Sequence, residues 1–265
     1  MLQALNLSLK RQWYYFILAL GFFTRIPVPN FANFQERDLN HSAKYFPLIG
    51  IVVGAVGALV FWLADFLLPL EVAVLLSMAS TIFLTGAFHE DGLADAADGL
   101  GGGWSKEQVL TIMTDSRIGS YGTVALSLAL LTKYQALSYQ AAMLMPAFIV
   151  AAHALSRLCA VLVMFTQSYV KFEGKSKPLA TQLSPNELIL ATFFGLLPLA
   201  FLDMKFLFAL VPVLVVWLWF SAKIKKRIGG YTGDCLGAMQ QLTELAFYLG
   251  LLASVTIFPN PLINT

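Results

Sequence analysis

Apolar runs that approach or reach the length of a membrane-spanning helix recur along the whole chain. A helix needs about 20 mainly apolar residues to cross a bilayer. Only 12% of the residues are charged, against roughly 25% in soluble domains. The 265 residues are therefore expected to form an all-α, polytopic helical bundle in a membrane, as a single domain.

About seven segments are expected to cross the membrane. Before them, Trp13–Phe23 is only about half the length of a span, so it is predicted to be an interfacial or re-entrant helix. Gly50, Gly54 and Gly57 recur on one face of the first span, which favours close helix packing. The predicted spans are Phe46–Leu68, Val72–Phe88, Val124–Leu137, Ala141–Phe165, Leu188–Leu202, Phe206–Phe220 and Leu242–Phe258.

The distribution of basic residues predicts the orientation of these spans. With the N-terminus in the cytoplasm, all but three of the 17 Lys and Arg residues lie on the cytoplasmic side, as the positive-inside rule requires. The exceptions are Lys133, Arg157 and Lys205. Four polar segments converge on the same side, which indicates a site at the cytoplasmic interface and not a channel. They are His89–Gly103, Met113–Gly122, a loop with Lys171, Lys175 and Lys177, and Gly229–Ala238.

Net charge and cysteine content exclude several classes. A net charge of +2 is too small to indicate a nucleic-acid partner. Cys159 and Cys235 lie far apart in the sequence, so they fit neither a disulfide framework nor a zinc site.

The segment His89–Gly103 carries four of the fifteen acidic residues directly after an apolar run. If the preceding helix continues through it, Asp91, Asp95 and Asp98 fall at i, i+4 and i+7 on one face. Like charges so placed repel, and a divalent cation with oxygen ligands offsets that repulsion. With Glu90, they suit one or two magnesium ions. The alternative is a solvated acidic linker, which the Ala and Leu residues between the acids disfavour.

Other polar groups near this segment have two interpretations each. Gly101 and Gly102 permit the backbone to approach a bulky or phosphorylated partner. His89 is either an electrostatic group beside the carboxylates or a structural hydrogen-bonding residue. Arg117 either binds phosphate in a bidentate fork or forms a loop ion pair with Asp115.

The second glycine-rich segment, Gly229–Asp234, permits a backbone nest for an anion, with Asp234 as an additional metal ligand; the alternative is a flexible turn. The basic run Lys223–Arg227 before it is interpreted as an orientation signal facing anionic lipid. Within the spans, His153, Arg157 and Glu244 are functional candidates, because intramembrane charge is costly.

Four motifs together resemble the adenosylcobinamide-GDP ribazoletransferases, also called cobalamin synthases: Thr24–Pro29, His89–Gly99, Met113–Gly119 and Gly229–Ala238. They occur in order over nearly the whole chain. The resemblance implies a magnesium-dependent enzyme of the bacterial inner membrane, with its active site facing the cytoplasm. It would join adenosylcobinamide-GDP to α-ribazole or its 5′-phosphate, giving adenosylcobalamin or its phosphate, and GMP.

The resemblance and the residue patterns together assign roles at the site. The aspartates would hold magnesium against the diphosphate, Arg117 would stabilise developing charge, and one carboxylate would accept the hydroxyl proton. The expected catalytic residues are Asp91, Asp95, Asp98, Arg117 and His89; the expected substrate-binding residues are Arg25, Gly101, Gly102, Asp115, Arg157, Gly230, Thr232 and Gly233; the expected metal ligands are Asp91, Asp95, Asp98, Glu90 and Asp234.

Three rival classes remain open from the sequence. CDP-alcohol phosphotransferases also use spaced aspartates, but their Asp-Gly pair is followed shortly by Ala-Arg, whereas Leu93-Ala94-Asp95 follows Gly92 here. Membrane prenyltransferases have two aspartate-rich motifs, and one is visible. A transporter would predict broken or charged spans forming a path across the bilayer. The oligomeric state, the number of magnesium ions and the preferred form of ribazole stay open.

Overall fold

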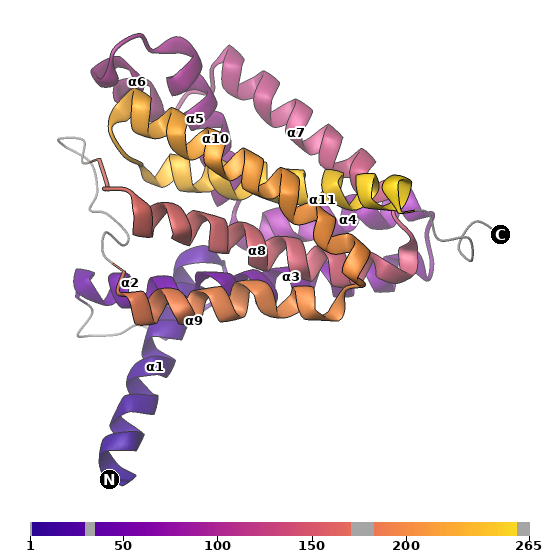
Figure 1. Ribbon diagram of the computed structural model, residues 1–265, viewed down its shortest axis with the longest axis horizontal. Coiled ribbons are helices and arrows are strands. Elements are labelled where there is room, and N and C mark those ends of the chain that lie inside the picture. Colours follow the sequence, from indigo (N-terminus) through magenta and orange to yellow (C-terminus); the bar gives the residue numbers. More distant parts are fainter. Residues whose placement is uncertain (1, 30–34, 171–182, 259–265) are drawn as a thin grey trace.

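The described part of the chain is helical apart from turns and one isolated bridge. The structure, a computed structural model, describes residues 2–29, 35–170 and 183–258 (Figure 1). The bridge joins Tyr169 and Tyr231 in parallel. The expectation of an all-helical chain is therefore confirmed for these residues. The predicted lysine loop, with Lys171, Lys175 and Lys177, lies outside the described residues.

Eleven α-helices and four short 3₁₀ segments make up the described residues. They are α1 (Leu2–Phe23), α2 (Glu36–Ser42), η1 (Ala43–Tyr45), α3 (Phe46–Asp65), α4 (Leu70–Thr85), α5 (Phe88–Gly102), α6 (Lys106–Met113), α7 (Ser120–Ser138), η2 (Ala142–Leu144), α8 (Met145–Thr166), α9 (Pro185–Leu196), η3 (Leu197–Phe201), η4 (Met204–Ala209), α10 (Leu210–Ile228) and α11 (Gly233–Ile257).

The core of the bundle is α8, which packs against α3, α9 and α11. The predicted close packing of the first span is confirmed for two of its glycines. A Cβ atom at Gly50 would lie 2.8 Å from the Ala154 Cα atom of α8, and one at Gly54 would lie 2.8 Å from the Val150 Cα atom. Gly57 instead faces α4, where a Cβ atom would lie 2.6 Å from Thr81 Cγ2.

The outer surface of the bundle is rich in large apolar side chains, as expected for contact with lipid. Among the described residues, three segments are long and apolar enough to cross a membrane: 38–65, 142–166 and 204–228. The bent pair of α4 and α5 would add a fourth if it is one span. The prediction of seven crossings is therefore not confirmed by length and hydropathy. The other predicted spans belong to helices that are short, such as α9, or begin in polar sequence, such as α7 and α11.

A sharp bend separates α4 from the acidic segment. The two helices meet at 85°, and both residues between them, Gly86 and Ala87, have positive φ angles of 66° and 59°. A positive φ is strained for alanine. The expectation that the preceding helix continues through the acidic residues is therefore wrong. They nevertheless keep their helical spacing, because Asp91 and Asp98 both lie within α5.

The first helix extends away from the bundle and crosses the direction of its long helices (Figure 1). Trp13 is 64% exposed on it, and Leu9 is also exposed. The second half of α1 packs against the bundle, with Tyr15, Ala19 and Phe23 buried. The Phe23 ring lies against Phe46 of α3, with ring centroids 4.3 Å apart. This position suits a helix that lies along a membrane surface.

Candidate functional site

The acidic helix α5 lies directly against the first turns of α11. A Cβ atom at Gly92 would lie 3.0 Å from the Asp234 carbonyl oxygen and 3.2 Å from the Gly237 Cα atom. A side chain at Gly92 would therefore force the two helices slightly apart where they cross. Asp91 is exposed and Asp95 is half-buried on the turns flanking Gly92. The sequence-distant acidic segment and the Gly229–Ala238 segment thus meet, as predicted.

Asp98 connects α5 to the segment that precedes α7. Its carboxylate accepts hydrogen bonds from the backbone N–H groups of Gly119, at 2.7 Å, and Gly122, at 2.9 Å. It is buried and sits at the N-terminal end of α7, where a negative charge is stabilised by unpaired N–H groups and by the helix dipole. Both glycines are needed because a Cβ atom at either would touch this carboxylate. Asp98 therefore anchors the 119–122 segment to α5.

Arg117 is 87% exposed and forms a bidentate ion pair with Asp115. Its Nη2 atom lies 2.7 Å from Asp115 Oδ2, and its Nε atom lies 3.1 Å from Oδ1. The loop ion pair, one of the two interpretations of this motif, is thus present. The hydrogen bonds and charge of Asp115 raise the pKa of Arg117, so the guanidinium stays charged.

A polar cleft of about 490 Å³ opens beside this ion pair. Its walls come from the end of α5, the end of α6 and the 115–121 segment, and they include Asp98, Gly102, Asp115, Arg117 and Tyr121. Gly102 lines this cleft. Gly101 is also exposed but does not line the cleft, and a Cβ atom there would lie 2.7 Å from the Tyr121 ring. The cleft therefore brings together four of the predicted site residues.

The glycine-rich segment before α11 has mainly structural contacts. Gly230 packs on Ser168 and Val170, and the N–H of Val170 donates to the Tyr231 carbonyl oxygen at 2.8 Å. Thr232 is the N-cap of α11, with its Oγ1 atom accepting from the Cys235 N–H. By contrast, a Cβ atom at Gly233 would meet nothing within 4 Å, so its backbone is accessible at the start of α11.

The phenol groups of Tyr169 and Tyr231, close to the start of α11, are neutral. Burial raises the pKa of Tyr231 to about 12, and burial likewise raises the pKa of Tyr169. Their rings pack edge to face, 5.7 Å apart. These phenols therefore add no negative charge beside Asp234.

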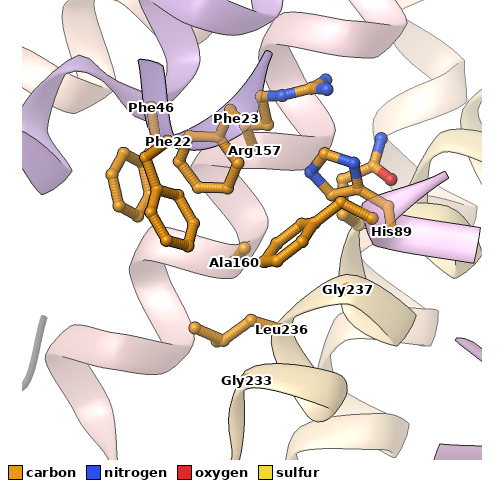
Figure 2. A pocket seen from close by; sticks show the side chains of 11 residues that line it. Phe22, Phe23, Phe46, His89, Arg157, Ala160, Gly233, Leu236 and Gly237 are labelled. Carbon is orange, nitrogen blue, oxygen red and sulfur yellow. The ribbon is translucent and has the colours of Figure 1, made fainter. Parts of the chain in front are cut away.

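His89 lines a small aromatic pocket at the start of α5. Its ring stacks on Phe23 with centroids 5.7 Å apart. Figure 2 shows Phe22, Phe46 and Leu236 around the same space, with the first turns of α11 beside it. The pocket encloses about 30 Å³, which admits one or two water-sized molecules. His89 is thus buried among aromatic rings, and we place no substrate here.

Arg25 lies over the bend that precedes α5. Its backbone N–H donates to the Leu84 carbonyl oxygen at 2.8 Å, and its guanidinium lies close to Gly86, where a Cβ atom would be 2.6 Å from Nε. The side chain is exposed and near the positive N-terminal end of the acidic helix. Arg25 of the Thr24–Pro29 motif therefore lies against the bend that leads into α5.

Glu90 and Arg157 do not lie with the exposed carboxylates. Both are buried. Glu90 accepts a hydrogen bond from Gln241 of α11 at 2.9 Å, while Arg157 donates to the His153 carbonyl oxygen at 3.0 Å. The structure therefore does not bring the five predicted metal ligands together, because Glu90 faces the interior and Asp98 is bound to backbone amides.

The remaining carboxylates are consistent with magnesium. In the described part of the chain, no three His, Cys, Asp or Glu side chains are close enough to hold a metal by themselves. Magnesium, however, is usually held by one or two carboxylates and completes its shell with water and substrate phosphates. Asp91 and Asp95, one helical turn apart on the accessible side of α5, offer such a pair of oxygen ligands.

The sequence did not predict the contacts of three residues near the site, Arg227, Gln240 and Gln241. Arg227, interpreted there only as part of an orientation signal, donates to the Leu100 and Gly103 carbonyl oxygens and so holds the C-terminal end of α5. Basic residues commonly bind such free carbonyl groups. Gln240 and Gln241 were also missed, since nothing in the sequence marks a glutamine as buried.

Comparison with known proteins places the chain in a family. It is 47% identical over 250 residues to the adenosylcobinamide-GDP ribazoletransferase of Ralstonia pickettii (strain 12J), covering 93% of this chain and 98% of the relative. It is 44% identical over 249 residues to the protein of that name from Shewanella frigidimarina (strain NCIMB 400), covering 92% and 95%. No solved structure matches. Residues 15–252 match the family model described as cobalamin-5-phosphate synthase. The chain therefore belongs to the cobalamin-5-phosphate synthase family.

Proposed function

We propose that the protein is an adenosylcobinamide-GDP ribazoletransferase, which joins adenosylcobinamide-GDP to α-ribazole or its 5′-phosphate and releases GMP. Family membership supports the reaction. The observation that carries the assignment of the site is the convergence of three polar segments on α5, through Gly92 with Asp234, Asp98 with Gly122, and Arg227 with Gly103.

The reaction exchanges one phosphoryl–oxygen bond for another. A ribazole hydroxyl attacks the phosphorus nearer cobinamide, the bond from that phosphorus to the bridging oxygen breaks, and GMP leaves with the bridging oxygen. The hydroxyl proton passes to a carboxylate of the acidic face. Such a transfer depends mainly on positioning and on neutralising charge.

Individual side chains supply these two requirements. We assign Asp91 and Asp95 as ligands of magnesium, with Asp234 at the same crossing. When bound, magnesium neutralises diphosphate charge and stabilises the leaving oxygen. Arg117 is exposed and exchanges its pairing with Asp115 for a diphosphate oxygen in the adjoining cleft. Asp98 holds the 119–122 backbone that forms one wall of that cleft.

The membrane arrangement follows the same proposal. The protein crosses the bacterial inner membrane several times, seven in the arrangement that the sequence favours, with the site on the cytoplasmic side. Two observations support it: the apolar outer surface of the bundle and the position of α1, which suits an interfacial helix (Figure 1).

A reconstitution assay tests the function. Purified protein in liposomes receives adenosylcobinamide-GDP and α-ribazole with and without magnesium, and GMP and cobalamin are quantified. Both products should form only with magnesium. Asp95→Asn should abolish turnover while the protein still inserts and folds, whereas Glu71→Gln, an exposed carboxylate at the start of α4, should not. Transport without product would favour a transporter instead.

A further inference from the structure

Charged and amide side chains form a buried cluster behind the acidic helix. It contains residues from four helices, and all are buried: Glu90 of α5, Lys133 of α7, His153, Ser156 and Arg157 of α8, and Gln240, Gln241 and Glu244 of α11. Buried charges of this kind are costly and are kept where they have a role. The proposed reaction uses none of these groups directly.

The centre of this buried cluster is an ion pair between Lys133 and Glu244. The Lys133 Nζ atom lies 2.9 Å from Glu244 Oε1, and the two side chains are only 7% and 1% exposed. Removing one member of a buried pair leaves an uncompensated charge. The pair therefore fixes α7 and α11 relative to each other.

Gln241 transmits this fixed arrangement to α5. Its Oε1 atom accepts from Lys133 Nζ at 3.2 Å, and its Nε2 atom donates to Glu90 Oε1 at 2.9 Å. The lysine is only a donor and the carboxylate only an acceptor, so the amide has one possible orientation. The hydrogen bonds therefore run in one direction, from α7 through α11 to α5.

The start of α5 has no side-chain cap, so the contact of Glu90 with Gln241 adds to the contacts that fix its rotation. Gly86 and Ala87 are both left-handed, and the N-cap residue, Ala87, has no side-chain hydrogen bond to the helix. Successive residues on a helix are about 100° apart. Holding Glu90 toward the interior therefore turns Asp91 outward and fixes the direction of Asp95 one turn later.

We propose that Glu90 and Gln241 are positioning residues that set the rotation of α5, and thereby aim Asp91 and Asp95 into the site. The inference rests on the proposed function for its purpose, but the rotation itself is measurable without substrate. It also gives Glu90 a role other than metal ligand.

Cysteine labelling measures the rotation. Cys159 and Cys235 are buried, so a cysteine introduced on α5 reports its own accessibility to a charged maleimide. In the parent protein, Asp91→Cys should react at least about tenfold faster than Ala94→Cys, which lies on the buried side and reacts only through local opening. Adding Gln241→Leu should bring the two rates within about threefold of each other.

Two matched variants make the test specific. Glu90→Gln should keep the parent labelling ratio, because its amide oxygen still accepts from Gln241. If Glu90 were a metal ligand, the ratio would also be kept, but the response of turnover to magnesium would be weakened. Gln140→Leu, a buried glutamine beyond the end of α7, should also keep the ratio. An unchanged ratio in a folded, monodisperse Gln241→Leu protein would overturn the proposal, whether or not the parent turns over substrate.

Discussion

Replacing Asp98 with asparagine should destabilise the protein, whereas the same change at Asp91 should not. Asp98 accepts two backbone hydrogen bonds, from Gly119 at 2.7 Å and Gly122 at 2.9 Å. Asparagine keeps one acceptor oxygen, but its NH₂ group then faces a backbone N–H, which is also a donor. Asp91 is exposed, so its replacement removes no buried partner.

The size of the effect follows from these two contacts. A hydrogen bond to a charged group contributes about 1.5–3 kcal/mol. Asp98→Asn loses one such bond and removes the charge from the other, so we expect a loss of about 2–4 kcal/mol. For a chain of this size, 1 kcal/mol changes Tm by about 2–4 °C, so Tm should fall by about 5–15 °C.

Thermal unfolding in detergent, followed by circular dichroism, provides the measurement. Asp91→Asn is the control and should stay within about 2 °C of the parent protein. Gly122→Ala should mimic Asp98→Asn, because its Cβ atom would displace the same carboxylate and lie 2.8 Å from the Ala94 carbonyl oxygen. The double variant should then be less destabilised than the sum of both changes. Equal Tm values for Asp98→Asn and Asp91→Asn would refute this reasoning.

Three further predictions concern other parts of the chain. Arg117→Ala should lower kcat at least about tenfold, while Tm changes little because an exposed ion pair contributes little to stability; unchanged kinetics would remove Arg117 from the site. Gly50→Ala should lower Tm strongly, whereas Gly233→Ala, with open space around it, should not; similar Tm values would contradict the packing. Burial raises the pKa of Glu187, but hydrogen bonds from His41 and Ser184 outweigh it and lower the pKa below 4.5. The ionised Glu187 side chain therefore stabilises the protein above that pH, and the stabilisation is lost in more acidic solution. The drop in Tm between neutral pH and a pH below 4.5 should thus be smaller in Glu187→Gln than in the parent protein.

The sequence predicted those features of the site that depend on local spacing. Asp91 and Asp98 both lie in α5, and their separation matches the helical repeat. The short polar segments between apolar helices were expected to lie at the surface. The convergence of the acidic segment with Asp234 was predicted from topology alone. The spacing of Gly50, Gly54 and Gly57 predicted close helix packing, because small residues permit close approach, but it did not identify α8 as the partner of Gly50.

Other features depend on tertiary contacts that no local pattern encodes. The bend at Gly86 and Ala87 was missed because an alanine with positive φ has no sequence signature. The seven spans were inferred from hydropathy alone, but α11 begins with polar residues that other helices bury. Asp98 was grouped with the metal ligands because sequence spacing predicts which residues share a face of a helix, but not which segment packs against that face.

The rotation of α5 about its axis depends both on local sequence spacing and on tertiary contacts. Intramembrane charge is costly and commonly marks a functional residue, and Arg157 and Glu244 were candidates on that ground. In the structure, Lys133 and Glu244 neutralise each other at 2.9 Å, and Gln241 carries the contact onward to Glu90. A chain of hydrogen bonds that ends on the neighbour of Asp91 is better explained by orientation than by transport. The buried Glu90 and the exposed Asp91 are adjacent residues of α5, so a hydrogen bond that holds one of them inside the bundle also directs the other toward the proposed site.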